Sequence, residues 1–385
     1  MPVFESAGCS WGKRLSAARA EYERSQRWRV RQVNQGNSLD FASNDYLGLA
    51  LDPRVCEAQA KGARRFGAGA GASHLVNGHL SVHEALEVAL AEWLGRERAL
   101  LFSTGYMANL GVLQALADPH TAIFQDRLNH ASLIDGATLS GAPSRRFHHC
   151  DMADLQRLLA RNEREHRLVV SDGVFSMDGD VADIAGLSAI SRKHRAWLMI
   201  DDAHGVGVLG ERAAGCTEGF TSAEVPILIG TLGKALGTAG AFVAGDTALV
   251  EHVLQFSRSY TYTTAQPPGV ASATLTSLEI LQAEPERRHR LRENIGQFRC
   301  GAQSLGLPLA QSETPIQPLL LGDEARTLRW ADELKCQNIA VGAIRPPSVP
   351  RGQSRLRVTL RACHRRKDID RLLETLGQCL RKEAL

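Results

Sequence analysis

The stretch WLMIDDAHG, residues 197–205, decides the fold of this chain. Its first four residues are apolar and run directly into Asp201, Asp202 and, two residues later, His204. A short run that is apolar on both faces is typical of a parallel strand covered by helices on both sides. Ligands of open α/β sheets bind beyond the carboxyl ends of the strands. The stretch therefore predicts both a sheet and a binding site at its edge.

Five more short apolar runs predict the other strands of this sheet. They are Ala99–Phe102, Ala122–Phe124, Leu168–Val170, Ile227–Ile229 and Ala241–Val243. Helix-like segments separate most of these runs, which predicts a largely parallel sheet of the α/β class. A short glycine-rich link joins the last two runs, which leaves room for one antiparallel neighbour because parallel strands need a longer crossover.

Helices are predicted before this sheet region. Residues 1–35 are rich in Arg and Glu and predict an N-terminal helix, followed by a turn around Asn34–Asn37. A second helix is predicted over Ser81–Leu94, where Ser81 can cap the helix and Glu84 follows three residues later. Apolar residues at helical spacing line one face of this segment.

The chain is expected to divide into an arm and two domains. Its 385 residues are too many for one simple core. A charged helical stretch, Ala283–Phe298, leads out of the sheet region, and a strand, helix and strand pattern restarts near Ile316. The predicted units are an N-terminal arm over residues 1–40, a large α/β domain over 41–285 and a small C-terminal α+β domain over 286–385.

Composition narrows the class of protein. Hydrophobic residues make up 44% of the chain and charged residues 23%, as in ordinary cytosolic globular proteins. The net charge of +3 predicts binding neither to nucleic acid nor to a membrane surface. The eight cysteines form no CxxC pair, which argues against a zinc ribbon or a secreted disulfide framework and indicates a cytoplasmic protein with reduced thiols.

Two targeting features are not predicted. The N-terminus shows no basic stretch followed by an apolar run, so no signal peptide is expected. Residues 225–245 are the longest candidate for a membrane span, but Lys234 lies in their middle and small residues dominate them. A lysine at mid-span is unfavourable, so a buried strand pair with a loop between is the better interpretation.

The motif TLGKALG, residues 231–237, places one lysine among small residues after a predicted strand. An average lysine is a solvated surface charge, and the motif taken alone leaves that interpretation open. Close packing would instead desolvate the amine of Lys234 and lower its pKa. A Schiff base forms from the neutral amine. Lys234 is therefore a candidate for covalent binding of pyridoxal 5′-phosphate (PLP).

The acidic residues after the strand at 197–200 have three interpretations. They could cap a helix, or they could bind a metal together with His204. A carboxylate at Asp201 could instead pair with the protonated pyridine nitrogen of PLP, because the ring needs a permanent negative partner to withdraw electrons. His204 could then reach the phenolic oxygen of the ring.

Two further motifs follow predicted strands. In FSTGYMANLG, residues 102–111, a strand, Ser-Thr-Gly and a helix would place free backbone N–H groups at a helix N-terminus, which suits a phosphate. An ordinary helix cap is the alternative. In DRLNHASL, residues 126–133, His130 could be a structural histidine or could stack on an aromatic cofactor.

The glycine-rich stretch FGAGAGASHLVNG, residues 66–78, superficially suggests a dinucleotide-binding motif. No apolar strand precedes it and its spacing is loose, so it fails the structural context that such a motif requires. We interpret it as a flexible, glycine-dependent loop near the active site.

Three motifs together resemble the α-oxoamine synthases, which are fold-type I PLP-dependent enzymes. DGVFSMDGD (172–180), IDDAHGVGVLG (200–210) and TLGKALG (231–237) occur in the order and spacing of that family. The resemblance extends from FASNDYLGL (41–49) to RLRVTL (355–360). It implies a transferase fold with a large, mostly parallel sheet domain, a smaller C-terminal α+β domain and an N-terminal helical arm, assembled as a homodimer.

The resemblance also implies a role for individual residues. Lys234 would hold PLP covalently and act as acid and base at the substrate Cα. The other catalytic groups would be Asp201, which pairs with the pyridine nitrogen, His204, which reaches the phenolic oxygen, and His130, which stacks on the ring. The implied cofactor-binding residues are Gly105, Tyr106, His130, Ser176, Asp201, His204, Thr231 and Lys234, with Thr264 reaching the phosphate from a second subunit. The implied substrate-binding residues are Asn44, His130, Ser348, Arg357 and an N-terminal arginine, for which Arg24 is preferred over Arg27.

The substrates are implied by AIRPPSVP, residues 343–350. This stretch resembles the family member that joins L-alanine to a pimeloyl thioester, carried by CoA or acyl-carrier protein, in biotin synthesis. Two positions depart from the family pattern: His74 stands where arginine is frequent and Ser348 where threonine is commoner. The alternatives are another α-oxoamine synthase such as glycine C-acetyltransferase, an aminotransferase or lyase of the same fold type, and a non-catalytic PLP-binding or nucleotide-binding module.

Overall fold

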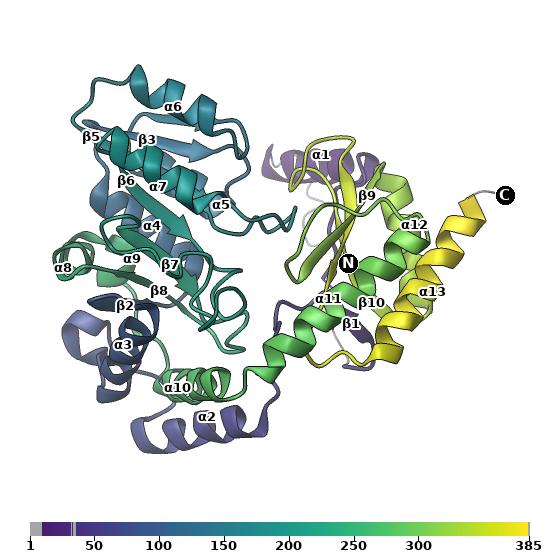
Figure 1. Cartoon of the computed structure of the whole chain (residues 1–385), viewed down its shortest axis with the longest axis horizontal. Helices are drawn as coiled ribbons and strands as arrows, with labels where there is room; N and C mark the ends of the chain where they lie inside the picture. Colours follow the sequence, from purple (N-terminus) through teal and green to yellow (C-terminus); the bar gives the residue numbers. More distant parts are fainter. Residues whose placement is uncertain (1–9, 32, 34–35, 384–385) are drawn as a thin grey trace.

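The computed structural model describes residues 10–31, 33 and 36–383, which form two lobes joined by one long helix. Figure 1 shows a large sheet with helices around it in one lobe and a smaller sheet with helices in the other. The joining helix is α11, Glu286–Ser304, which runs from the lower edge of the large lobe into the small one.

The large lobe is built on a seven-stranded sheet. Its order is β2 (Arg98–Phe102), β8 (Ala241–Gly245), β7 (Ile227–Thr231), β6 (Trp197–Asp201), β5 (His166–Asp172), β3 (Thr121–Asp126) and β4 (Ser144–Phe147). The strands from β7 to β4 pair in parallel, and β8 is antiparallel to both of its neighbours. The sheet is therefore mostly parallel with one antiparallel member, as the sequence predicted.

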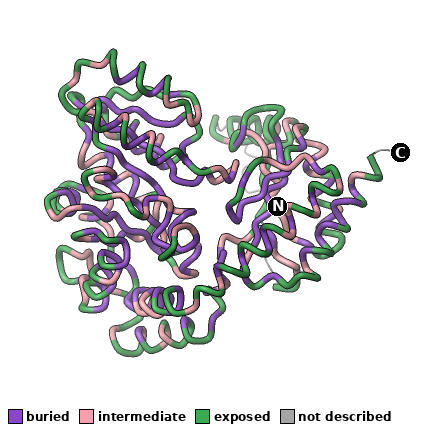
Figure 2. Tube along the Cα trace, viewed as in Figure 1, coloured by how far each residue is buried: buried purple, intermediate pink, exposed green. Residues whose placement is uncertain are grey.

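Both faces of the sheet are buried under helices. On β6, Met199 packs into the core formed with α4 (Gly105–Leu116), α5 (Ala131–Leu139) and α8 (Thr247–Phe256). Its neighbours Leu198 and Ile200 pack into a different core, with α6 (Met152–Ala160) and α7 (Ile184–Lys193). This alternation follows from the strand geometry, in which successive side chains point to opposite faces. Figure 2 shows the strands as the buried centre of the lobe.

Five further helices belong to the large lobe in the part of the chain that the structure describes. They are α2 (Pro53–Phe66), the short π-helix η1 (His74–Gly78), α3 (Ser81–Leu94), α9 (Arg258–Thr261) and α10 (Pro268–Ala283). Helix α10 contacts both α2 and α3. One continuous apolar core joins α3 and α10 to α11 and to the small sheet, so the two lobes share buried contacts.

The small lobe carries a four-stranded sheet in the order β1 (Leu39–Phe41), β10 (Ile339–Ile344), β11 (Ser354–Thr359) and β9 (Ile316–Gly322). The helices α12 (Glu324–Cys336) and α13 (Arg366–Glu383) belong to this lobe, and α1 (Ser10–Arg24) lies beside it in Figure 1. The strand, helix and strand pattern that restarts near Ile316 is confirmed as β9, α12 and β10.

Several sequence expectations need correction. Ser81 is the first residue of α3 and not its cap, because the cap is Leu80, whose backbone N–H donates to Nδ1 of His83. Strand β4 was not predicted, since its residues SRRF are mostly exposed and polar. Strand β1, at the predicted boundary between arm and large domain, pairs with β10 in the small sheet. The predicted turn at Asn34–Asn37 lies partly outside the described residues.

Among the described residues, no helix is both long enough and apolar enough to cross a membrane.

One buried carboxyl in the large lobe makes stability depend on pH. Glu87 on α3 is 6% exposed, and its Oε1 accepts a hydrogen bond of 2.9 Å from the backbone N–H of Leu101. Burial raises the pKa of Glu87 from its ordinary 4.5 to about 7. The unfolded chain thus releases this proton at lower pH than the folded protein does, so stability is lost as pH rises between these values.

Glu87→Gln should remove this loss, because the amide oxygen can still accept from Leu101 while the titrating proton is gone. We expect the variant to be more stable than the wild type by roughly 3 kcal/mol at pH 8 and by much less at pH 5. Thermal unfolding of both apoproteins at the two pH values measures the effect. A difference in Tm that does not grow with pH would contradict it.

Candidate active site

Three acidic residues end neighbouring parallel strands at one edge of the large sheet. Asp126, Asp172 and Asp201 are the last residues of β3, β5 and β6, and Asp172 lies opposite Asp201 in the strand register. Each is buried. Because carboxyl ends of parallel strands gather at the same edge, this is where a ligand of an open α/β sheet binds.

Lys234 lies in the loop that follows β7 at this edge. The loop is tight: Gly237 has a φ of +66°, and a Cβ there would come within 2.3 Å of the backbone N of Ala50. Burial and the charge of Arg357 lower the pKa of Lys234, which the carboxylates Asp201 and Asp172 partly restore, and the balance is about 8. Roughly a tenth of the amine is therefore neutral at pH 7, far more than for an ordinary lysine.

The carboxylate of Asp201 is held by two donors. Oδ2 accepts from Nδ2 of Asn109 at 2.6 Å, and Oδ1 accepts from the backbone N–H of Ala203 at 3.0 Å. Asp201 is 5% exposed. No helix begins at this position, so the helix-cap interpretation of the aspartate is wrong. The two bonds fix the orientation of a buried negative charge.

His130 caps the N-terminus of α5 and presents an exposed ring beside the site. Its backbone N–H donates to Oδ2 of Asp172 at 2.6 Å, and its Nδ1 lies 2.7 Å from Oγ of Ser132. Burial of part of the ring lowers its pKa, against the opposing charge of Asp201. The ring is also edge-on to that of Tyr106, with centroids 6.4 Å apart.

His204 is hydrogen-bonded to a tyrosine that the sequence analysis did not single out. Nδ1 of His204 lies 2.6 Å from Oη of Tyr46, whose side chain is fully buried. Burial raises the pKa of Tyr46 to about 12, and burial holds the pKa of His204 well below its usual value. The phenol thus keeps its proton, and the imidazole is neutral.

Arg357 connects the small lobe to the large one. It lies on β11 and is 6% exposed. Its Nε donates to the backbone oxygen of Ser176 at 2.6 Å, and its Nη1 donates to Oδ1 of Asn44 and Oγ1 of Thr359. The side-chain nitrogen Nη2 takes part in none of these bonds. The structure thus brings three residues named from the sequence, Arg357, Asn44 and Ser176, into one group.

The N-terminus of α4 forms another wall of this edge. Oγ1 of Thr104 accepts from the N–H of Met107 at 3.1 Å, so the predicted strand, Ser-Thr-Gly and helix arrangement is present. A Cβ added at Gly105 would meet nothing within 4 Å, which leaves open space beside the first N–H groups of the helix. The exposed Tyr106 donates through its hydroxyl to Asp135.

Two threonines named from the sequence lie on different elements. Thr231 ends β7, and its hydroxyl donates to the backbone oxygen of Gly240 at 3.0 Å. Thr264 is exposed and forms a β-bridge with Ser73 in the glycine-rich stretch. The glycine-rich stretch therefore packs against the segment after α9.

An arginine other than the two considered from sequence reaches Ser348. Nη2 of Arg29 lies 2.9 Å from Oγ of Ser348, whereas Arg27 bonds locally to Ser25 and Glu21. Arg24 ends α1, exposed. Arg29 and Ser348 line a cleft of about 800 Å³ between the arm and the small lobe, together with Arg345, Trp28, Met177 and Ile344.

The residues at this edge fit PLP. A neutral lysine amine can bind the aldehyde, a fixed carboxylate can pair with the pyridine nitrogen, and the free N–H groups at the start of α4 can bind the phosphate. The open space at Gly105 and the exposed ring of His130 leave the room that a flat ring and its phosphate need.

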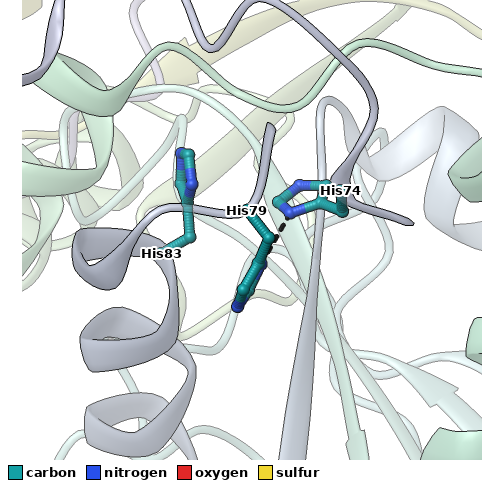
Figure 3. Close-up of side chains that lie close together, drawn as sticks. All are labelled: His74, His79 and His83. Carbon is teal, nitrogen blue, oxygen red and sulfur yellow. Dashed lines mark hydrogen bonds between the residues drawn. The ribbon is translucent and has the colours of Figure 1, made fainter. Parts of the chain in front are cut away.

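A cluster of three histidines lies apart from these residues, at η1 and the start of α3 (Figure 3). Nδ1 of His83 accepts from the N–H of Leu80 and its Nε2 lies 2.8 Å from the backbone oxygen of Gln266. His79 lies 2.9 Å from both His74 and Glu84. Since these hydrogen bonds occupy both ring nitrogens of His83 and of His79, we interpret the cluster as a brace for the glycine-rich stretch.

A second cluster positions the loop at 172–180. His149 lies 3.0 Å from Asp126 at the end of β3 and 2.8 Å from Asp180. Although burial opposes a charge on this ring, the two carboxylates raise the pKa of His149 to about 12. The imidazolium therefore ties this loop to the sheet.

Three of the residues that the sequence analysis missed lie within the motifs that were quoted. Tyr46 belongs to FASNDYLGL, Asn109 to FSTGYMANLG and Asp172 to DGVFSMDGD. Only Arg29 lies outside them. The composition of each motif was informative, but it does not show which of its polar side chains point toward the site.

Comparison with known proteins supports one family. The model of the aminotransferase class I and II family matches residues 37–376. The chain is 62% identical to an 8-amino-7-oxononanoate synthase of Chromohalobacter salexigens, over 97% of this chain and 98% of that one. It is 52% identical to the enzyme of the same name from Cellvibrio japonicus, over 96% of both chains.

Solved structures agree with these sequence relatives. A serine palmitoyltransferase from S. paucimobilis with bound PLP and myriocin superposes with a TM-score of 0.90 at 30% identity, covering 97% of this chain and 98% of that one. An 8-amino-7-oxononanoate synthase from Francisella tularensis superposes with a TM-score of 0.79 at 30% identity, covering 91% and 100%.

Proposed function

Because this chain belongs to the 8-amino-7-oxononanoate synthases, within the aminotransferase class I and II family, we propose that it condenses L-alanine with a pimeloyl thioester. The carboxylate of alanine leaves as CO₂, a carbon–carbon bond forms between Cα and the acyl carbon, and the thiol of the carrier is released. The product is 8-amino-7-oxononanoate, a precursor of biotin. The fold-type I resemblance and the PLP cofactor predicted from the motifs are confirmed.

The observation that carries the proposal is the convergence of charged groups on Lys234. The pKa of its amine is set by burial together with Asp201, Asp172 and Arg357, which arrive from three strands of two sheets. When bound, PLP supplies an electron sink that allows negative charge to develop at Cα of the amino acid. The chain must then hold the ring protonated, take up the Cα proton and bind the alanine carboxylate.

Each of these tasks is assigned to a residue of the site. Asp201 keeps the pyridine nitrogen protonated, because its carboxylate is buried and fixed by two donors. The neutral amine of Lys234 takes the proton from Cα. His204 would donate to the phenolic oxygen from Nε2, the ring nitrogen that does not contact Tyr46, and the ring of His130 would stack on the cofactor ring. The hydroxyls of Ser176 and Thr231 and the N–H groups of Gly105 and Tyr106 complete the cofactor contacts.

The acyl chain is proposed to enter the cleft between the arm and the small lobe. Arg29 lies there beside Ser348, and burial together with the charge of Arg29 lowers the pKa of Arg345. Two guanidinium groups close together favour a ligand with a negative charge, and a pimeloyl chain ends in a carboxylate. We therefore replace Arg24 with Arg29 as the N-terminal arginine that meets the acyl substrate.

Arg357 is proposed to bind the carboxylate of alanine. Since Nε and Nη1 are occupied by Ser176, Asn44 and Thr359, Nη2 is the nitrogen left to face the substrate. Arg357→Lys should raise the KM for alanine by roughly tenfold or more, because one ammonium cannot keep these three bonds and also bind a carboxylate. Steady-state kinetics with each substrate varied in turn measure this. If the KM for the thioester rises equally, the assignment is wrong and Arg345 becomes the better candidate.

Substrate choice is tested by a product assay. Purified protein is supplied with L-alanine and with pimeloyl-CoA, acetyl-CoA, succinyl-CoA or palmitoyl-CoA, and the release of CoA and CO₂ is measured. We expect pimeloyl-CoA to be the preferred donor. Preference for acetyl-CoA with glycine would instead indicate a glycine C-acetyltransferase, and release of no CoA with any donor would indicate an aminotransferase or lyase. Pimeloyl-acyl-carrier protein in place of pimeloyl-CoA identifies the carrier.

A cytoplasmic homodimer is part of the same proposal. The cysteines in the described part of the chain are free thiols, which suits a reducing compartment. Thr264 is exposed and lies next to the glycine-rich stretch, where it could face a second subunit. Sedimentation of the purified protein tests the dimer.

A further inference from the structure

One buried amide, that of Asn109, lies between Asp201, which is assigned to the pyridine nitrogen, and His130, which is assigned to one face of the cofactor ring. Asn109 is on α4, one turn after Gly105, and is 1% exposed. Its Nδ2 donates to Oδ2 of Asp201 at 2.6 Å and to Oγ of Ser132 at 2.9 Å. Oγ of Ser132 in turn lies 2.7 Å from Nδ1 of His130. A single chain of hydrogen bonds thus runs from the carboxylate to the imidazole.

The direction of every bond in this chain is determined. Nδ2 of an amide only donates, and a carboxylate only accepts. Nδ1 of His130 also accepts from the backbone N–H of Ser132, so it carries no hydrogen and the hydroxyl of Ser132 donates to it. His130 is therefore held as the neutral tautomer with its hydrogen on Nε2. The orientation of Asn109 fixes the orientation of the Asp201 carboxylate and that of the Ser132 hydroxyl, which donates to His130.

The buried side-chain oxygen of Asn109 destabilises the folded protein, which indicates that this amide serves the site and not stability. Oδ1 of Asn109 is buried and has no hydrogen-bond partner among the described residues. A buried acceptor without a partner destabilises the folded protein. An apolar side chain of similar size would avoid that loss, but it would leave Asp201 without the donor to Oδ2.

We propose that Asn109 is a positioning residue for the reaction. It acts through Asp201, by fixing the carboxylate that meets the pyridine nitrogen, and through Ser132, by fixing the ring of His130. This rests on the PLP site described above and not on the identity of the acyl substrate. The expected consequence is that loss of Asn109 weakens cofactor binding and lowers kcat, with little change in the KM for the thioester.

The test uses the purified full-length protein, freed of cofactor, and PLP as the probe. For Asn109→Ser we expect the apparent Kd for PLP to rise roughly 10- to 100-fold, about the effect of losing a hydrogen bond to a charged group. Ser132→Ala leaves the bond between Asn109 and Asp201 in place, so its effect on the Kd should be smaller. Asn294 is the matched control: it is a buried amide whose Nδ2 also donates twice, to the backbone oxygens of Arg361 and His364. Asn294→Ser should leave the Kd within about twofold of wild type.

A second variant separates positioning from a loss of stability. Asn109→Asp keeps the shape of the side chain but places a carboxyl beside Asp201. A protonated Asp at this position can still donate to Asp201, whereas two ionised carboxylates repel each other. The ratio of the Kd of this variant to that of wild type should therefore rise with pH, and the absorbance of the bound cofactor should titrate differently from wild type.

Two outcomes would overturn the proposal. One is a Kd for PLP in Asn109→Ser and Asn109→Asp that equals the wild-type value at every pH. The other is an equal rise in Asn294→Ser, which would make the effect a general loss of folding. If Asn109→Ser does not fold, the pH dependence of the Kd for PLP in Asn109→Asp tests the proposal by itself. A wrong assignment of the acyl substrate would leave all these binding results unchanged and would appear only in the product assay.

Discussion

Lys234→Ala is expected to lose covalently bound PLP and to lose turnover by several orders of magnitude, because the variant has neither the amine that binds the aldehyde nor the base at Cα. The wild-type protein should be yellow, and borohydride should fix the cofactor to the lysine. The reason lies in the environment of this amine: burial lowers its pKa to about 8, so the nucleophilic neutral form is available.

The positions of the other lysines allow the labelled residue to be identified without ambiguity. Its six other lysines, at positions 13, 61, 193, 335, 367 and 382, are all exposed on helices. Lys61→Ala is a suitable control, because this lysine forms only a loose surface pair of 3.9 Å with Glu57. Peptide mapping after reduction identifies the labelled residue. A label on any lysine other than Lys234 would show that the central assignment is wrong.

Asp201→Asn should retain part of its PLP while turnover falls by several orders of magnitude, the scale on which fixed charges act in active sites. The amide has nearly the same shape and can still accept from the N–H of Ala203, so the fold should persist. What is lost is the negative charge that we propose keeps the pyridine nitrogen protonated. Apparent Kd for PLP and kcat, measured on the same preparation, separate binding from turnover.

The adjacent aspartate provides the control. Asp202 is fully buried, and burial raises its pKa to about 7. Because this carboxyl is about half protonated at pH 7, Asp202→Asn removes only part of a negative charge, and its oxygen can still accept from the N–H of Cys216. We expect turnover of the same order of magnitude as wild type. Near-normal turnover in Asp201→Asn, or an equal fall in Asp202→Asn, would exclude the specific role of Asp201.

The sequence by itself determined the large sheet, because the pattern that marks its strands is local. Residues 197–200 are apolar on both faces and end at Asp201, and this suffices to place β6 inside the sheet with a polar group at its carboxyl end. The antiparallel position of β8 followed from the short link after residue 231. The proposal that Lys234 holds the cofactor came from three motifs whose order and spacing resemble those of one family, and no single motif would have led to it.

Tertiary structure alone decided the elements that are stabilised by their neighbours. Strand β1 has three residues, and its place in the small sheet depends on pairing with β10, about 300 positions later in the chain. Strand β4 lies at the sheet edge with charged, exposed residues, so no apolar pattern marks it. The partner of β1 is distant in sequence and β4 is held at the edge by its pairing with β3, so a local apolar pattern marks neither strand.

The same distinction holds for the site. Asn109 faces Asp201 because of the rotation of α4 against the sheet, and Arg29 reaches Ser348 because the arm folds over the small lobe. The sequence supplies these side chains, but their roles depend on which elements converge and on the direction in which each helix presents them. Packing of the whole chain sets both, since most of the stability of a helix in a protein comes from the face that it buries.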